Sequence, residues 1–357
     1  GYWKDFPAQR PFILMRAGYS GSQRFGMIPW SGDVNRSWGG LQSQMEIALQ
    51  MGLQGMGYMH SDLGGFAGDY FDNELYLRWL QYGVFNPIFR PHAQEEVASE
   101  VARKDIVTKA KAKKSVALRY QLLPYNYTLG YQNSTFGIPL MRPLFFEEPN
   151  NERLATVADT YLWGSDFLIK PIVNPGVTQT DVYFPSTANW FDFYTFKKFM
   201  GGKKVGIPVV EDHIPTFVRA NTLIPMTSVV QNTNLYQNRM LDLIAFIDGM
   251  GSTQRSFYFD DGSTPAANLQ PENHEFLAAN LESTTQKTSI TLENKTDSSL
   301  VHPTEKTGKI TLYAISKKPK SITQNGQKIP FEWFSKSKKL CFNYNHNQAK
   351  TTLIITY

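Results

Sequence analysis

The side chains best suited to chemistry lie between residues 16 and 92, and each of them follows a short apolar or glycine-containing run. One such run ends on Arg16, and a second ends on Asp33 through the tetrapeptide Trp-Ser-Gly-Asp. Asp62 follows a third run, and His92 comes directly after Pro91. A carboxyl group at such a position can transfer a proton, and guanidinium or imidazole groups can donate hydrogen bonds to a ligand.

The elements that must position these groups alternate between strand-like and helical patterns. Continuous apolar character predicts strands, whereas apolar residues spaced three or four apart predict helices. We expect strands at 11–16, 27–30 and 53–60 and helices at 41–51 and 73–82. Strand ends that carry such side chains, separated by helices, are typical of one rim of a (β/α)8 barrel, where the chemistry of that fold takes place.

In the remainder of the chain, the residue pattern changes near Ser165 from helical spacing to short β-like runs. Before that point the pattern predicts a long helix over 98–132 broken at Pro124, a strand over 138–146 and a last helix over 157–163. After it, short β-like runs alternate with turn residues, and Asn325-Gly326 is a specific hairpin signal. This spacing favours two antiparallel β-sandwiches.

We therefore predict three domains: the second half of a (β/α)8 barrel at 1–164, a proximal β-sandwich at 165–237 and a distal β-sandwich at 238–357. About four barrel strands precede Ser165, which is half of the closed set. A half barrel would leave a parallel sheet edge open to water. The missing strands are therefore expected to come from an N-terminal half of the same protein.

The motifs and their order resemble those of glycoside hydrolase family 31, which contains retaining α-glucosidases and α-xylosidases. The resemblance covers roughly the first three quarters of the chain. The matching residues are Arg-Ala-Gly-Tyr-Ser-Gly-Ser-Gln-Arg-Phe at 16–25, Trp-Ser-Gly-Asp at 30–33, Ser-Asp-Leu-Gly-Gly-Phe at 61–66, Glu-Leu-Tyr-Leu-Arg-Trp-Leu-Gln at 74–81, Arg-Pro-His at 90–92, and the segments 118–125, 139–144, 214–220 and 258–262.

The resemblance implies that Asp33 is the general acid/base of a retaining glycosidase. That reaction needs a second carboxyl group, the nucleophile, roughly 5–5.5 Å away. In the family the nucleophile lies on a barrel strand in a segment that comes before the position of Arg16, so we expect it from outside this chain. The alternative reading of Asp33 is a cap for the helix that follows it.

The same resemblance implies a sugar pocket around the acid/base. Arg16 and His92 would hydrogen-bond sugar hydroxyls, Trp30 and Phe66 would be aromatic walls, and Asp62 would contribute to the pocket. Sugars offer hydroxyls to charged donors and C–H faces to aromatic rings, which suits these residue types. Arg16 as a plain ion-pair partner and His92 as a core histidine remain alternatives.

Three other acidic positions are candidates for catalytic or metal-binding groups. Asp62 is the only other well-placed carboxylate on the rim, but the family does not use that position as nucleophile. Phe-Asp-Asn-Glu at 71–74 opens a helix instead of ending a strand, so we reject it. Asp-Asp-Gly at 260–262 lacks the further acidic spacing of a calcium loop and predicts a tight turn. No metal or organic cofactor is implied.

The composition narrows the classes of partner. The net charge is +5, but residues 301–357 carry ten Lys and two Glu, so that this tail alone is +8. Its lysines lie between β-like runs without Arg clusters, which favours a solvated face over nucleic-acid binding. No apolar run is long enough to span a membrane. The single cysteine, Cys341, excludes an internal disulfide.

The sequence thus predicts an exo-acting α-glycosidase, most simply an α-glucosidase acting on oligosaccharides. α-Xylosidase and α-galactosidase activities are alternatives in the same family. A non-catalytic carbohydrate-binding protein on the same scaffold is the alternative from another class, but binding alone does not require the proton donor at Asp33.

Overall fold

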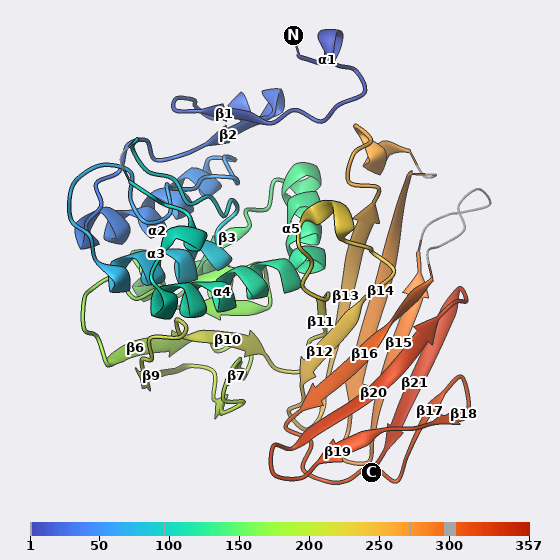
Figure 1. Cartoon of the computed structure of the whole chain (residues 1–357). Helices are drawn as coiled ribbons and strands as arrows, with labels where there is room; N and C mark the ends of the chain where they lie inside the picture. The colour runs from blue at the N-terminus through green and yellow to red at the C-terminus, as the bar shows by residue number, and fades with distance from the viewer. Residues whose placement is uncertain (1, 96, 271–272, 296–304) are drawn as a thin grey trace. The chain divides into compact units, whose positions relative to one another are not determined.

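The computed structural model describes residues 2–95, 97–270, 273–295 and 305–357 (Figure 1). The chain divides into two compact units. One unit combines residues 1–10, 120–131 and 218–357, and the other combines residues 11–119 and 132–217. All the candidate site residues lie in the second of these units.

The barrel-like part consists of parallel segments that follow one another in the chain. β1 (Ile13–Met15) pairs in parallel with β2 (Met27–Pro29). Beyond β2, a parallel bridge joins Trp30 to His60, and another joins Leu63 to Pro91. Four consecutive segments therefore run in the same direction, and their carboxyl ends meet at one edge, as a half barrel requires.

Helices connect these segments and begin at side-chain caps. The Ser37 hydroxyl accepts the Gly40 N–H at 3.0 Å, and the Asp72 carboxylate accepts the Glu74 N–H at 2.8 Å. Both caps satisfy backbone donors that a helix start leaves free. The helices of the described chain are α1 (Tyr2–Asp5), α2 (Trp38–Leu53), α3 (Asn73–Val84), α4 (Ile106–Gln121) and α5 (Leu123–Phe136). The expected break at Pro124 is confirmed as the interruption between α4 and α5.

Several local predictions were wrong. The strand expected at 53–60 is absent: Leu53 ends α2, residues 54–59 form turns in which Gly55 takes a left-handed conformation, and only His60 pairs with a neighbour. Residues 157–163 contain no helix; their buried aromatic end is β4 (Tyr161–Trp163). The first strand is also partly exposed although its residues are apolar: Phe12 beside it is 64 % exposed, because β1 has one described neighbour.

The sheet of the proximal region begins with β3 and β4, upstream of Ser165. It has the strand order β3-β4-β5-β10-β7-β8, and a separate antiparallel pair, β6-β9, lies against the same apolar core. Phe184, Trp190 and Phe217 are fully buried in that core. The strands are β3 (Met141–Pro143), β5 (Phe167–Ile169), β6 (Gln179–Phe184), β7 (Trp190–Asp192), β8 (Lys198–Phe199), β9 (Lys203–Pro208) and β10 (Thr216–Arg219).

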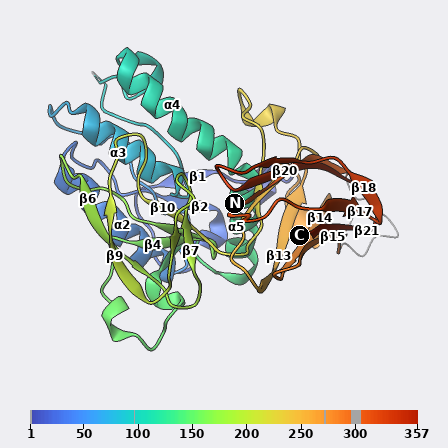
Figure 2. The same ribbon diagram turned by 90° about the horizontal axis from the view of Figure 1, so that it is seen from below.

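The distal region is a sandwich of two sheets (Figure 2). The strand orders of the two sheets are β11-β12-β16-β20-β19 and β13-β14-β15-β21-β17-β18. One apolar core contains side chains from both sheets. The strands are β11 (Ile224–Met226), β12 (Asp242–Phe246), β13 (Gly251–Asp260), β14 (His274–Ser283), β15 (Lys287–Asn294), β16 (Lys306–Tyr313), β17 (Ser321–Gln324), β18 (Gln327–Ile329), β19 (Glu332–Phe334), β20 (Lys339–His346) and β21 (Lys350–Thr356).

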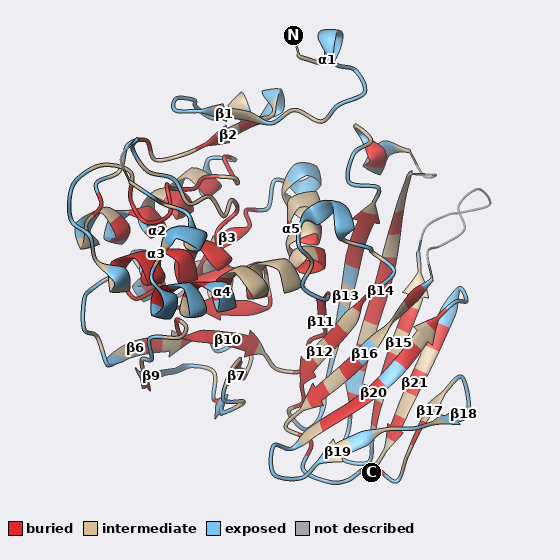
Figure 3. Ribbon diagram, in the orientation of Figure 1, coloured by how far each residue is buried: buried red, intermediate tan, exposed pale blue. Residues whose placement is uncertain are grey.

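Along β15 and β21 buried residues alternate with less buried ones (Figure 3), as a sheet with one apolar face requires. The predicted hairpin is confirmed: Asn325 and Gly326, both at positive φ, connect β17 to β18. One pair departs from the expected antiparallel pattern. β12 and β16 are parallel neighbours in one sheet, because the chain passes through three strands of the other sheet, β13 to β15, before it returns. Within the described residues, no helix has the length and apolar character needed to cross a bilayer.

Candidate active site

The carboxyl ends of the four parallel segments carry the predicted site residues. Arg16 follows β1 directly, and Asp33 lies four residues after β2. Asp62 comes two residues after the bridge at His60, and His92 follows the bridge at Pro91. The register of β1 and β2 and the two bridges therefore bring to one edge side chains that are up to 76 residues apart in sequence.

Arg16 and Asp33 form an ion pair at this edge. The guanidinium carbon of Arg16 also lies 5.4 Å from the centre of the Trp30 ring, within the range of a cation–π contact. The side chains of Arg16 and Asp33 are 59 % and 47 % exposed. An ion pair so open to water contributes little stability, so it can open without a large cost when a ligand competes for it.

Asp62 makes a different ion pair, with Arg90. Its carboxylate is 1 % exposed, and the Arg90 side chain is 23 % exposed. The Arg90 Nε also donates to His60 Nε2 at 3.3 Å, and its guanidinium carbon lies 5.9 Å from the centre of the Trp30 ring. Arg90 thus connects a buried carboxylate, a buried imidazole and the aromatic ring beside Asp33.

Burial is the main cause of the pKa shifts of Asp62 and His60. Burial raises the pKa of Asp62; Arg90 and His92 act in the opposite direction, and the nearby Asp33 charge adds to the rise. Burial, together with the positive charge of Arg90, lowers the pKa of His60 to about 4. His60 Nδ1 lies 3.4 Å from the Tyr58 carbonyl oxygen. A neutral imidazole that donates there and accepts from Arg90 satisfies both contacts.

Phe66 and His92 form the aromatic side of the site. Their ring centres are 5.4 Å apart with an interplanar angle of 32°. The Phe66 carbonyl oxygen accepts the Gln94 N–H at 3.1 Å, which ties the two loops together. Gly64 and Gly65 before Phe66 both have positive φ, and a Cβ on Gly65 would lie 2.5 Å from the Arg36 Cα atom. The Gly-Gly-Phe sequence is therefore required by the backbone path.

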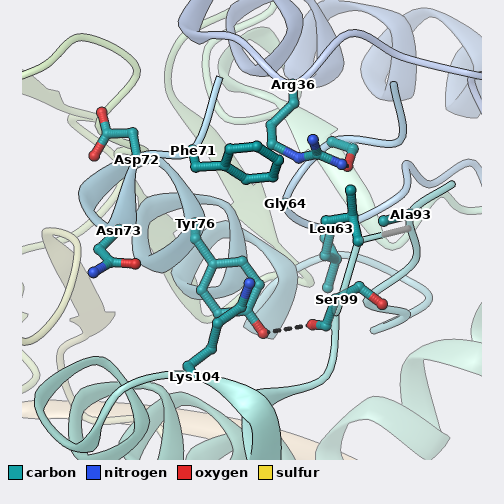
Figure 4. A pocket seen from close by; sticks show the side chains of 12 residues that line it. Arg36, Leu63, Gly64, Phe71, Asp72, Asn73, Tyr76, Ala93, Ser99 and Lys104 are labelled. Carbon is teal, nitrogen blue, oxygen red and sulfur yellow. Dashed lines mark hydrogen bonds between the residues drawn. The ribbon is translucent and has the colours of Figure 1, made fainter. Parts of the chain in front are cut away.

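A pocket with a cavity volume of about 50 Å³ lies beside this loop (Figure 4). Polar side chains of Arg36 and Lys104 and the rings of Phe71 and Tyr76 face it. The Tyr76 hydroxyl donates to the Ser99 carbonyl oxygen at 2.7 Å. The volume suits a few water molecules rather than a sugar ring.

Comparison with known proteins decides the family. Residues 1–129 match the glycosyl hydrolases family 31 TIM-barrel domain, and residues 137–224 match the glycosyl hydrolase family 31 C-terminal domain. Together these matches cover more than half of the 357 residues. The chain belongs to glycoside hydrolase family 31. The predicted family and fold class, half of a TIM barrel followed by β-sandwich domains, are confirmed.

Relatives with similar sequences are named as α-glucosidases. Alpha-glucosidase 2 of Bacillus thermoamyloliquefaciens is 36 % identical over 270 residues, which are 74 % of this chain and 33 % of the relative. Neutral alpha-glucosidase AB of Homo sapiens is 33 % identical over 267 residues, which are 72 % of this chain and 27 % of the relative. The family 31 chain thus spans about a third of the length of these relatives.

Solved structures of the family have the same fold. The Flavobacterium johnsoniae GH31 dextranase, complexed with isomaltotriose, matches with a TM-score of 0.90 and 25 % identity, over 100 % of this chain and 47 % of that chain. The GH31 alpha-xylosidase from Xanthomonas citri matches with a TM-score of 0.82 and 25 % identity, over 98 % of this chain and 38 % of that chain.

Three further residues of this family 31 chain contact the candidate site residues or the loop that carries Phe66, although sequence reasoning did not select them. Arg90 stood inside the quoted Arg-Pro-His motif, so its position at a strand end was a usable signal. His60 ends an apolar run in the same way. Arg36 gave no signal, because its partners are backbone carbonyl groups about 30 residues further along the chain.

Proposed function

We propose that this chain carries the general acid/base of a retaining exo-α-glycosidase, with Asp33 as that residue. The observation that carries the proposal is the carboxylate of Asp33, half exposed at the carboxyl edge of the parallel segments beside Arg16 and Trp30. A proton donor must reach the leaving-group oxygen, and an exposed carboxyl group can do so. When a sugar binds, its hydroxyl groups replace Asp33 as the partner of Arg16, which leaves Asp33 free to protonate the leaving group.

The nucleophile is proposed to come from a segment outside residues 1–357. Asp62 is the other carboxylate at this edge, but it is buried and paired with Arg90. A nucleophile must approach the anomeric carbon, which a carboxylate enclosed in this way does not do. The structure therefore supports a positioning role for Asp62 in the sugar pocket, next to Phe66 and His92.

The partner implied by this proposal is an N-terminal half of the same enzyme, which would complete the barrel. Apolar side chains at and next to β1 are exposed in this chain, including Phe12, Met15 and Tyr19. Neighbouring strands would cover such residues in a closed barrel. We call residues 1–357 together with that half the reassembled enzyme. No nucleic acid, membrane, metal or organic cofactor is part of the proposal.

The proposed substrate is an oligosaccharide with a terminal α-linked glucose. The names of the relatives support this, since they are α-glucosidases, and one related structure is a dextranase complexed with isomaltotriose. The related alpha-xylosidase keeps α-xylose as a second candidate. The aromatic walls and the hydrogen-bonding groups Arg16 and His92 serve either sugar, so the activity assay must include both, with α-galactose as a further comparison.

The test is the substitution Asp33→Asn in the reassembled enzyme. Removal of a general acid lowers the rate by roughly 10²–10⁴-fold when the leaving group is poor, and by less when it is an activated nitrophenol. We expect that difference in single-turnover cleavage of isomaltose compared with nitrophenyl α-glucoside. Asp212→Asn is the matched control, because Asp212 is also about half exposed and ion-paired, with Lys114. Equal losses for both substrates would contradict the role of Asp33 as proton donor.

A further inference from the structure

Arg36 binds three backbone carbonyl groups of the loop that carries Phe66. Its guanidinium group donates to the carbonyl oxygens of Gly65 at 3.3 Å, Phe66 at 3.0 Å and Gly68. Arg36 is 7 % exposed, so water competes little for these hydrogen bonds. The Phe71 ring covers the guanidinium carbon at 5.1 Å, as Figure 4 shows.

The same loop is also joined to the segment that follows Asp33. The N–H groups of Phe66 and Ala67 donate to the Val34 carbonyl oxygen at 2.9 and 3.2 Å, and the Arg36 N–H donates to the Ala67 carbonyl oxygen at 2.7 Å. Backbone and side chain of residues 34–36 thus bind both sides of the Phe66 peptide. The connection starts one residue after the proposed acid/base.

The position of the Phe66 ring depends on this connection. Phe66 itself belongs to no regular strand or helix, since residues 61–72 lie outside both. Its carbonyl oxygen accepts from Arg36 and from the Gln94 N–H, and its ring contacts His92. Without the guanidinium group, the carbonyl groups of Gly65, Phe66 and Gly68 would each lose a donor, and the loop would gain conformational freedom.

We propose that Arg36 is a positioning residue for sugar binding: it fixes the loop 65–68 so that Phe66 and His92 form one wall of the pocket. The inference rests on the proposed function, because the wall matters only if a sugar binds there. Arg36 itself touches no substrate in this arrangement. Its loss is therefore expected to weaken sugar binding while proton transfer by Asp33 continues.

Arg36→Met in the reassembled enzyme tests the proposal. We expect KM for nitrophenyl α-glucoside and the inhibition constant of glucose to rise about tenfold, with kcat changed less than twofold. Arg119→Met is the matched control, since Arg119 is half-buried and also donates to three carbonyl groups, those of Val84, Asn86 and Pro87. It should lower thermal stability without changing KM. Equal KM values for Arg36→Met and the wild type would overturn the proposal.

A double-mutant cycle separates positioning from general destabilisation. If Arg36 acts through Phe66, then Arg36→Met should raise KM little further in a Phe66→Leu background. If the two substitutions instead raise KM independently, so that their separate factors multiply in the double variant, the inference is contradicted. Hydrogen exchange of the 64–68 amides gives a readout that needs no activity: it should accelerate in Arg36→Met and stay unchanged in Arg119→Met. If the wild type binds and cleaves no α-glycoside, the proposed function fails, while unchanged exchange in Arg36→Met overturns the loop-fixing role by itself.

Discussion

Arg90 pairs with Asp62 across the strand ends, and the pair is asymmetric. The carboxylate is enclosed at 1 % exposure, while the guanidinium group remains in partial contact with water and also binds His60. Burial raises the pKa of Asp62 and so disfavours its charged form, whereas the positive charge of Arg90 acts in the opposite direction. The pair therefore sets the electrostatic conditions next to Asp33 without itself being open to a substrate.

The first prediction concerns Arg90. Arg90→Met should lower the free energy of unfolding of the reassembled enzyme by about 3–5 kcal/mol, because it leaves a buried carboxylate without its counterion. Combining it with Asp62→Asn should recover part of that loss. Urea unfolding of the single and the double variant measures the loss and the recovery. Lys114→Met is the control: its ion pair with Asp212 is exposed on both sides, and its removal should cost under about 1 kcal/mol. Equal losses for the two single variants would contradict the prediction.

The second prediction concerns the pH dependence that His60 confers. Its pKa is lowered by burial from 6.5 to about 4 in the folded state, so folding favours the neutral imidazole. The stability it contributes is fully present above pH 6.5 and is lost as the pH falls toward 4, by about 3 kcal/mol in total. His60→Gln keeps an acceptor for Arg90 and removes the titration.

Thermal unfolding at pH 7 and pH 5 checks this expectation. The wild type should lose more stability between these pH values than His60→Gln does. Burial also lowers the pKa of His346 in the distal sandwich to about 4, but that effect is common to both proteins and cancels in the difference. The prediction is wrong if the two proteins lose equal stability.

The third prediction concerns the stereochemistry of the product. If the nucleophile lies roughly 5–5.5 Å from Asp33, the reaction proceeds with retention, and the anomer released first is α. Proton NMR of the earliest product from nitrophenyl α-glucoside distinguishes the anomers before they interconvert. Initial release of the β anomer would indicate inversion and would exclude the proposed arrangement of the two carboxyl groups.

The fourth prediction is that residues 1–357 are inactive by themselves. Expressed alone, the chain should aggregate through the exposed apolar residues near β1, or persist through its sandwich domains without turnover. Co-expression with the upstream half should restore solubility and activity on α-glycosides. The assay uses nitrophenyl glucoside, xyloside and galactoside. A soluble monomer with normal turnover would place the nucleophile within this chain, and Asp62 would be the first residue to replace.

The sequence alone determined the family, the fold class and the residues at the strand ends. These features are local: a Trp-Ser-Gly-Asp motif, apolar runs that end on charged groups, and an Asn-Gly turn each fall within a few consecutive residues. Family motifs in a fixed order then imply the rest of the barrel rim. The division at residues 164 and 237 stays a prediction, because such patterns indicate elements better than they indicate which sheet an element joins.

Only the tertiary structure decided which partner each charged group takes. Arg16 pairs with Asp33, 17 residues away, whereas Arg90 pairs with Asp62, 28 residues away. Arg36 binds no carboxylate in the described structure but reaches carbonyl groups 29 to 32 residues away. Burial likewise separates the exposed Asp33 from the enclosed Asp62, although both are aspartates at strand ends. Partner choice and exposure depend on packing between distant segments, which no local pattern of residue types encodes.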